Sequence, residues 1–90
     1  MPSYLVETYI AGGGASELAA RERRARSAAE ELTRGTTRVS FDRSIHVPED
    51  ELCFYVFEAP SARAAELVAQ RAGLDPIRVV EAVSSGKEGR

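Results

Sequence analysis

Four segments of the chain carry the apolar patterns that are typical of β-strands, over residues 3–10, 38–47, 52–59 and 77–83. The first alternates along its length, as expected for side chains that point to opposite faces of a strand in turn. Its two faces would carry Tyr4, Val6, Thr8 and Ile10 on one side, and Leu5, Glu7 and Tyr9 on the other. The second alternates too, with one face expected to carry Val39, Phe41, Ile45 and Val47, interrupted by Arg43. The third, LCFYVFEA, is apolar on both faces, which indicates a central strand.

Two segments rich in good helix formers separate these strands, over residues 15–34 and 61–72. Ser16 and Ser61 are expected to cap the two helices, and Gly35 and Gly73 follow their ends. The resulting order is strand, helix, strand, strand, helix, strand. Because each strand–helix–strand unit crosses over right-handed, this order predicts an α+β, ferredoxin-like βαββαβ sandwich. Its four-stranded antiparallel sheet would have the first and third strands in the middle and both helices on one face.

The chain has 90 residues, enough for one domain, which we place at residues 1–84 with a flexible tail at residues 85–90. Its formal net charge of −2 argues against electrostatic binding of nucleic acid or of an anionic membrane surface. The N-terminal residues lack the pattern of a signal peptide, and no apolar stretch approaches the roughly 20 residues that span a bilayer. Cys53 is the single cysteine, so no internal disulfide can form. These features predict a cytoplasmic protein.

The two-sided third strand predicts a partner for the sheet. Two helices can cover one face only, and we expect Cys53, Tyr55 and Phe57 to lie on the other. Large apolar side chains left in water would each forfeit about 1.5–3 kcal/mol, and an exposed apolar patch usually marks an interface or a pocket. The simplest cover is a second copy of the chain, sheet against sheet. The sequence therefore predicts a homodimeric α+β barrel with a cavity between the two sheets.

The expected cavity supplies the candidate ligand-binding residues. Its lining would be formed by Glu7, Tyr9, Tyr55 and Phe57, with Arg43 or His46 as a further polar contributor. A buried Glu7 needs a partner, and Arg43, His46, Tyr55 or Glu81 would serve. Which of Arg43 and His46 shares the face of Glu7 depends on the hairpin register, which the sequence leaves open.

Each of these side chains also has a purely structural interpretation. His46, the only histidine, is either a proton shuttle or metal ligand or a solvated residue at a strand end. Cys53 is either a reactive thiol or an inert buried hydrophobe. Glu7 is either a catalytic or ligand-binding carboxylate or half of an ion pair. Paired cysteines and a second histidine are missing, so a metal site would have to use His46, Glu7, Asp42, Glu58 or groups donated across the dimer. No motif for an organic cofactor is present, and Gly12–Gly14 predicts a flexible turn rather than a phosphate loop.

Several motifs resemble those of a family of small bacterial domains of unknown function that is common in actinobacteria. The similar segments are YLVETY, RSIHVPEDELCFYVFEAPSARAAELVAQRAGL and IRVVEAV. The matching features are Glu7 in the first strand, Ser44 near a strand end, Cys53 upstream of Glu58-Ala59-Pro60, and the helix end Ala72-Gly73-Leu74. The resemblance covers nearly the whole chain except its tail.

The resemblance implies a ferredoxin-like fold and a dimer formed sheet to sheet. The family includes a nickel-binding protein, so nickel binding is also implied. That branch is richer in histidines than this chain, which has only His46, and no ligand residues are carried over. Similar dimeric barrels also include small monooxygenases and isomerases, an analogy of fold alone.

Three functions are consistent with these observations. The leading hypothesis is a homodimeric binding protein that holds a small ligand or a metal ion in the cavity between the sheets. The second is a small cofactor-free enzyme, an isomerase, cyclase or monooxygenase, in which Glu7 acts as general base. The third is an assembly module without a ligand, its cavity filled by the aromatic side chains.

Overall fold

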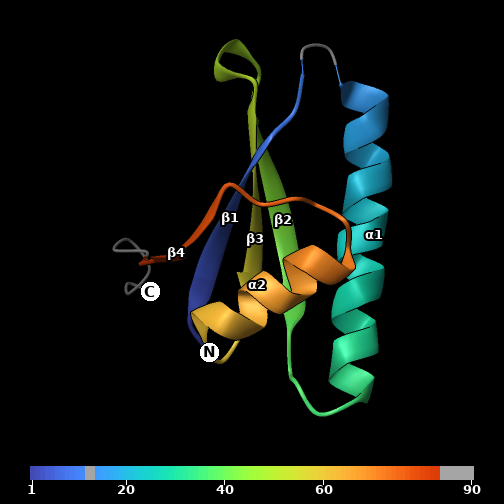
Figure 1. The fold of residues 1–90 in the computed structure, drawn as a ribbon, viewed down its shortest axis with the longest axis vertical. Helices are drawn as coiled ribbons and strands as arrows, with labels where there is room; N and C mark the ends of the chain where they lie inside the picture. Colours follow the sequence, from blue (N-terminus) through green and yellow to red (C-terminus); the bar gives the residue numbers. More distant parts are fainter. Residues whose placement is uncertain (12–13, 84–90) are drawn as a thin grey trace, which may run out of the picture.

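The computed structural model describes residues 1–11 and 14–83, and its elements follow one another in the order predicted from the sequence (Figure 1). The strands are β1 (Ser3–Tyr9), β2 (Ser40–Val47), β3 (Leu52–Glu58) and β4 (Arg78–Ala82). The helices are α1 (Ala15–Arg34) and α2 (Ala62–Arg71), with the single 3₁₀ turn η1 (Pro48–Asp50) between β2 and β3. The ferredoxin-like α+β fold is confirmed. The predicted tail and the glycines at 12 and 13 lie outside the described residues.

One of the two predicted helix caps is present. The Ser61 hydroxyl accepts a hydrogen bond from the backbone N–H of Ala64 at 3.1 Å, so Ser61 caps α2 as expected. The prediction for Ser16 is wrong, because α1 already begins at Ala15, with Gly14 as its N-cap residue and no side-chain cap. At the end of α2, Gly73 has a φ of +72°, a conformation that glycine adopts without the strain of a side chain.

The sheet order is β2-β3-β1-β4, and every neighbouring pair is antiparallel. β1 and β3 are therefore the central strands, as predicted. Figure 1 shows α1 running alongside β2 and α2 lying across the lower part of the sheet, and α2 contacts both β1 and β4. Neither helix in the described part of the chain is long and apolar enough to cross a bilayer.

The core lies between the sheet and the two helices. From the sheet it contains Tyr4, Val6 and Ile10 of β1 and the following loop, Phe41 of β2, and Cys53, Tyr55 and Phe57 of β3. From the helices it contains Ala25, Ala28, Ala29, Ala64, Ala65, Val68 and Ala69. The alanine stripe lets α1 lie close to the strands, because its side chains are short.

The predicted face assignment of β3 is wrong. Cys53, Tyr55 and Phe57 are fully buried beneath the helices, whereas Leu52, Phe54 and Val56 point to the face that no described helix covers. Both faces of the strand are apolar, so its own pattern does not distinguish them. The pairing with β1 makes the choice: Tyr55 lies opposite Val6 and Phe57 opposite Tyr4, and cross-strand partners share a face.

A bulge in β2 makes the predicted faces of this strand wrong, because Phe41 does not share a face with Ile45 and Val47. The register runs from Phe41 opposite Phe57 directly to Arg43 opposite Val56, so Asp42 is an extra residue in the strand. An extra residue reverses the alternation, since side chains on a strand have a period of two. Phe41 therefore points into the core, while Arg43, Ile45 and Val47 point to the other face of the sheet.

Candidate functional site

The face of the sheet opposite the helices, called the open face here, has an apolar centre. Its residues are Leu5, Glu7 and Tyr9 of β1, Arg43, Ile45 and Val47 of β2, Leu52, Phe54 and Val56 of β3, and Arg78, Val80 and Ala82 of β4. Leu5 and Phe54 are half-buried, Ile45 is 41% exposed, and Val56 is buried although it lies outside the helix-side core. Side chains of this kind on a sheet face are typical of a surface that packs against something.

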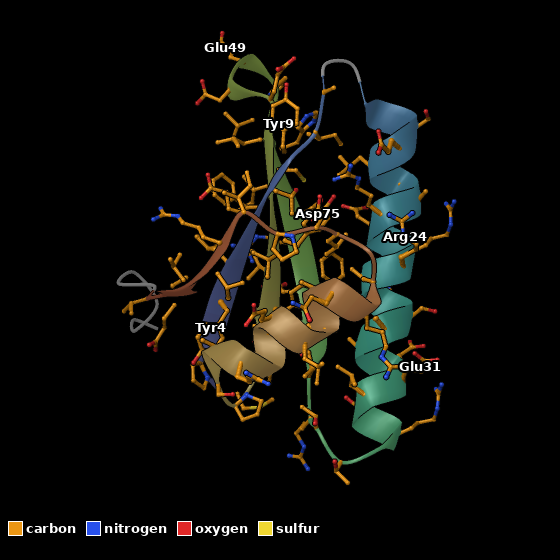
Figure 2. The ribbon with its side chains drawn as sticks, viewed as in Figure 1. Tyr4, Tyr9, Arg24, Glu31, Glu49 and Asp75 are labelled. Atoms are coloured by element: carbon orange, nitrogen blue, oxygen red, sulfur yellow. The ribbon has the colours of Figure 1, made fainter. Side chains whose placement is uncertain are left out.

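Polar side chains surround this centre in pairs. The Glu7 carboxylate accepts a hydrogen bond from Nε of Arg78 at 2.9 Å, across the β1–β4 pair. The side chain of Glu7 is only 18% exposed, so this ion pair satisfies a largely buried charge. At the end of the sheet near η1, the Tyr9 hydroxyl donates to the Glu51 carboxylate at 2.6 Å. Figure 2 shows Tyr9 at this end of the sheet, close to the turn that carries Glu49.

A hollow lies on the open face near the bulge in β2. Its volume is about 300 Å³, and all four strands contribute to its lining: Ser3, Leu5, Asp42, Arg43, Ile45, Val56, Ala82 and Val83. Polar and apolar atoms contribute about equally to this surface. The Arg43 guanidinium lies against the Asp42 carboxylate at 2.7 Å, so a charged pair stands at the edge of an apolar floor.

The structure divides the predicted ligand-binding residues between the two faces. Glu7, Tyr9 and Arg43 lie on the open face. Tyr55 and Phe57 lie in the core, so the expectation that they face Glu7 and Tyr9 is wrong; the cross-strand partners are Phe54 and Leu52 instead. His46 lies opposite Cys53 and therefore also points to the helix side. The register thus selects Arg43, not His46, as the residue that shares the face of Glu7.

The partner of Glu7 is a residue that sequence reasoning missed. Arg78 stands directly opposite Glu7 in the β1–β4 pairing, 71 positions away in the chain. The sequence did indicate that a carboxylate on a central strand needs a partner. The predicted partners, however, were residues of β2 and β3 and the wrong residue of β4. Glu81, the predicted residue of β4, lies three residues from Arg78 and on the other face of the sheet, because it stands opposite Tyr4.

A buried polar cluster lies on the helix side, under the N-terminal half of α1. The Tyr55 hydroxyl is buried and makes no hydrogen bond within residues 1–11 and 14–83. Burial raises the pKa of the Tyr55 hydroxyl above its ordinary value, the nearby Cys53 thiol adds to the rise, and the Arg21 guanidinium opposes it. Burial likewise raises the pKa of the Cys53 thiol, which favours its protonated form.

Side chains of α1 join this cluster to the strands. The Glu22 carboxylate accepts a hydrogen bond from the Ser44 hydroxyl of β2. Arg21 pairs with Glu17 at 2.8 Å and also reaches the backbone carbonyl of Tyr9 at 3.4 Å. These contacts tie the first two turns of α1 to β1 and β2, and they place the Arg21 guanidinium near the Tyr55 hydroxyl.

The residues of one chain do not fit the nickel ion that the family resemblance implies. Glu7 points to the open face and His46 to the helix side, so the two candidate ligands cannot meet on one ion. Among the described residues, no three side chains of the His, Cys, Asp or Glu type come close enough together to hold a metal ion. A nickel site would therefore need donors from outside the described residues of one chain.

Comparisons with known proteins bear on the fold. The chain matches no protein-family model, and no curated protein matches its sequence. Its structure is similar to the crystal structure of SCO4226 from Streptomyces coelicolor A3(2), with a TM-score of 0.77. The match covers 93% of this chain and 99% of SCO4226, at 19% sequence identity. At that identity the similarity supports the shared ferredoxin-like α+β fold and nothing finer.

Proposed function

We propose that this protein is a binding module that pairs with a second copy of itself through the open face and holds a small ligand between the two sheets. The observation that carries the proposal is the apolar stripe of Leu5, Ile45, Phe54 and Val56, on the face that no described helix covers. The proposal of a sheet-to-sheet partner therefore rests on the apolar residues of β3 that face away from the helices, not on those that the sequence analysis chose. The physical reason is the same: an apolar sheet face that no described helix covers.

Pairing of two open faces accounts for the arrangement of these side chains. In a two-fold interface every residue contributes twice, so one stripe on each chain produces a continuous apolar layer. Fully burying a Leu, Ile or Phe side chain contributes about 1.5–3 kcal/mol, and half-buried side chains contribute part of that. The Glu7–Arg78 pair lies at the β4 side of the stripe, where a polar rim is usual for protein interfaces.

The hollow of about 300 Å³ beside the stripe is the ligand site of this proposal. Its walls combine apolar and polar groups and favour a small amphipathic molecule, and Arg43 is placed to donate hydrogen bonds to one polar group of that molecule. Glu7 takes no part in chemistry here, because Arg78 already engages its carboxylate. Nickel is not part of the proposal, since Glu7 and His46 point to opposite faces.

The test compares two substitutions that change the same kind of side chain at the same exposure. Ile45 on the open face is 41% exposed and Leu67 on α2 is 42% exposed. Burying two unpaired carboxylates at a symmetric interface costs several kcal/mol, so Ile45→Asp should weaken the dimer by about a hundredfold or more. Leu67→Asp should leave it intact. Sedimentation equilibrium of the three proteins measures both effects.

A monomeric wild-type protein at tens of micromolar, or equal dissociation constants for the two variants, would refute the pairing. The ligand part has its own readout. Native mass spectrometry of freshly purified dimer should record mass in excess of two chains, and the excess should be lost in Arg43→Gln. A dimer that has the mass of two chains alone, in both proteins, would instead support assembly without a ligand.

A further inference from the structure

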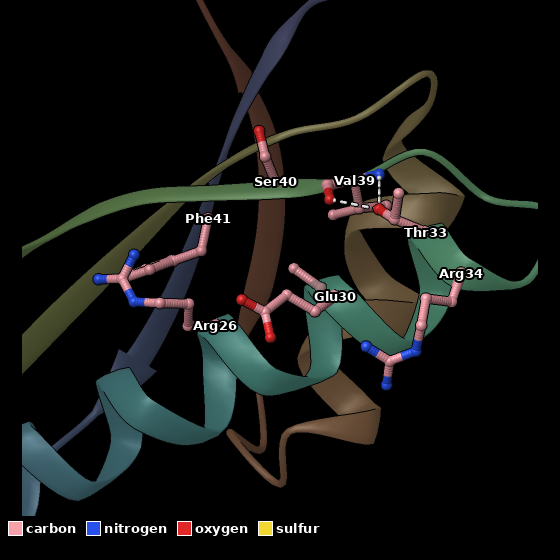
Figure 3. Close-up of a pocket in the computed structure, with 8 residues that line it drawn as sticks. Arg26, Glu30, Thr33, Arg34, Val39, Ser40 and Phe41 are labelled. Carbon is pink, nitrogen blue, oxygen red and sulfur yellow. Dashed lines mark hydrogen bonds between the residues drawn. The ribbon is translucent and has the colours of Figure 1, made fainter.

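A groove separate from the open face runs between α1 and the edge strand β2 (Figure 3). Its volume is about 480 Å³. The floor is apolar and consists of Ala29, Val39 and Phe41, all buried. Arg26, Glu30 and Arg34 stand along its α1 side, one turn of helix apart, as Figure 3 shows.

The β2 side of the groove is held in place by local contacts. The Thr33 hydroxyl accepts a hydrogen bond from the Val39 N–H at 3.1 Å and donates one to the Val39 carbonyl at 2.8 Å. This double contact fixes the chain where it returns from α1 to the sheet, and it turns the Val39 side chain inward. The Arg26 guanidinium lies over the Phe41 ring, 5.1 Å from its centroid, which orients the cation beside the floor.

The charges of the groove are unequal. Two guanidinium groups and one carboxylate line it, and within the described residues no carboxylate, Glu30 included, lies at ion-pair distance from Arg26 or Arg34. Both cations therefore keep their donors for another partner, and a guanidinium binds a carboxylate in a geometry with two parallel hydrogen bonds. The excess of positive charge favours an anionic ligand, and the apolar floor favours a ligand with an aromatic ring.

We propose that this groove binds a small aromatic carboxylate, with its ring on Val39 and Phe41 and its carboxylate between Arg26 and Arg34. A peptide strand added to β2 is a poorer occupant, because the bulge at Asp42 interrupts the edge that it would pair with. The site is independent of the open face, since it is lined by α1 and the helix side of β2. Its ligand is a different one from that of the dimer cavity.

The probe is 2-naphthoate, titrated into the full-length protein by isothermal calorimetry. It should bind once per chain, and Arg26→Gln or Arg34→Gln should each weaken binding about tenfold or more, because each removes a hydrogen-bonded charge. Arg63→Gln is the matched control: it removes the same charge from an exposed position on α2 and should change nothing. The neutral analogue 2-naphthylmethanol should bind at least about tenfold more weakly than the carboxylate.

A second variant tests the location without touching the charges. Ala29 forms part of the groove floor, so Ala29→Leu should fill part of the groove and weaken binding at least about tenfold, while the far-UV circular dichroism spectrum stays unchanged. Failure of 2-naphthoate to bind at millimolar concentration, or equal binding by a folded Ala29→Leu variant, would overturn the proposal. Equal affinity for the alcohol and the carboxylate would also overturn it. Ile45→Asp separates this site from the dimer interface, because it should dissociate the dimer and leave 2-naphthoate affinity unchanged.

Discussion

Tyr55 combines a ring that packs in the core with a hydroxyl that makes no hydrogen bond to any described residue, and this makes Tyr55→Phe an informative substitution. The ring packs against Phe41 with centroids 6.4 Å apart, and the hydroxyl is buried with no hydrogen bond within the described residues. A buried polar group left without a partner costs about 1–3 kcal/mol, whereas the phenyl ring keeps the packing. The variant should therefore gain about 1 kcal/mol in the free energy of unfolding, at the low end because Cys53 and Arg21 lie near the hydroxyl.

The measurement is urea unfolding followed by circular dichroism, at one protein concentration, because a dimer's stability depends on concentration. A gain of about 1 kcal/mol corresponds to an increase in melting temperature of roughly 4–8 °C for a domain of this size. Tyr9→Phe is the matched control. The exposed Tyr9 hydroxyl donates to Glu51, so the same substitution there removes a hydrogen bond and should lower stability slightly or leave it unchanged.

The pH dependence provides an independent check. Burial raises the pKa of the Tyr55 hydroxyl above its ordinary 10.0 and that of the Cys53 thiol above its ordinary 9.0. Both groups are neutral when protonated, so the folded chain holds their protons more tightly than the unfolded chain. Their contribution is complete below pH 9, and it is lost as the pH rises through the folded values. Tyr55→Phe should therefore lose less stability than the wild type above pH 10. Lower stability of Tyr55→Phe at neutral pH, or parallel losses in alkali, would refute the reasoning.

Two serine substitutions and one labelling reaction test the local structure. Ser61→Ala should lower the free energy of unfolding by about 1 kcal/mol, because Ser61 caps α2, whereas Ser16→Ala should change it by only a few tenths, since Ser16 caps nothing. Equal losses in chemical denaturation would contradict these cap assignments. Cys53 should react with a thiol reagent only when the core opens, because the side chain is fully buried and its pKa is raised. Its labelling rate should fall as urea is removed, and fast labelling of the native protein would contradict the burial.

The extent of each helix and strand follows from short-range patterns in the sequence. β1 alternates, and its side chains point as the alternation predicts, with Val6 and Thr8 buried and Glu7 on the other face. α1 spans the predicted residues because its composition favours a helix throughout. Ser61 and Gly73 act at the ends of α2 through contacts and dihedral angles within a few residues. Information of this kind is local, and the sequence contains all of it.

The features that a pattern could not supply are those that depend on which strands meet and in what register. β3 is apolar on both sides, so only its pairing with β1 assigns Tyr55 to the core and Phe54 to the open face. The bulge at Asp42 reverses the alternation of β2, and the sequence pattern of this strand does not predict it. Because cross-strand neighbours have Cβ atoms only about 4.5–5.5 Å apart, a shift of one residue exchanges every partner.

The candidate sites follow the same division. The sequence established that a face of the sheet would be apolar beyond what two helices can cover, since that depends on the amount of apolar surface and the number of elements. Folding assigned that face to Leu5, Ile45, Phe54 and Val56, and it brought Arg78 to Glu7 across 71 positions of chain. Composition is a property of the sequence, whereas the choice of which residues become neighbours in space depends on how distant segments pack. The presence of an uncovered apolar face was therefore predictable from the sequence, and the residues that form it were not.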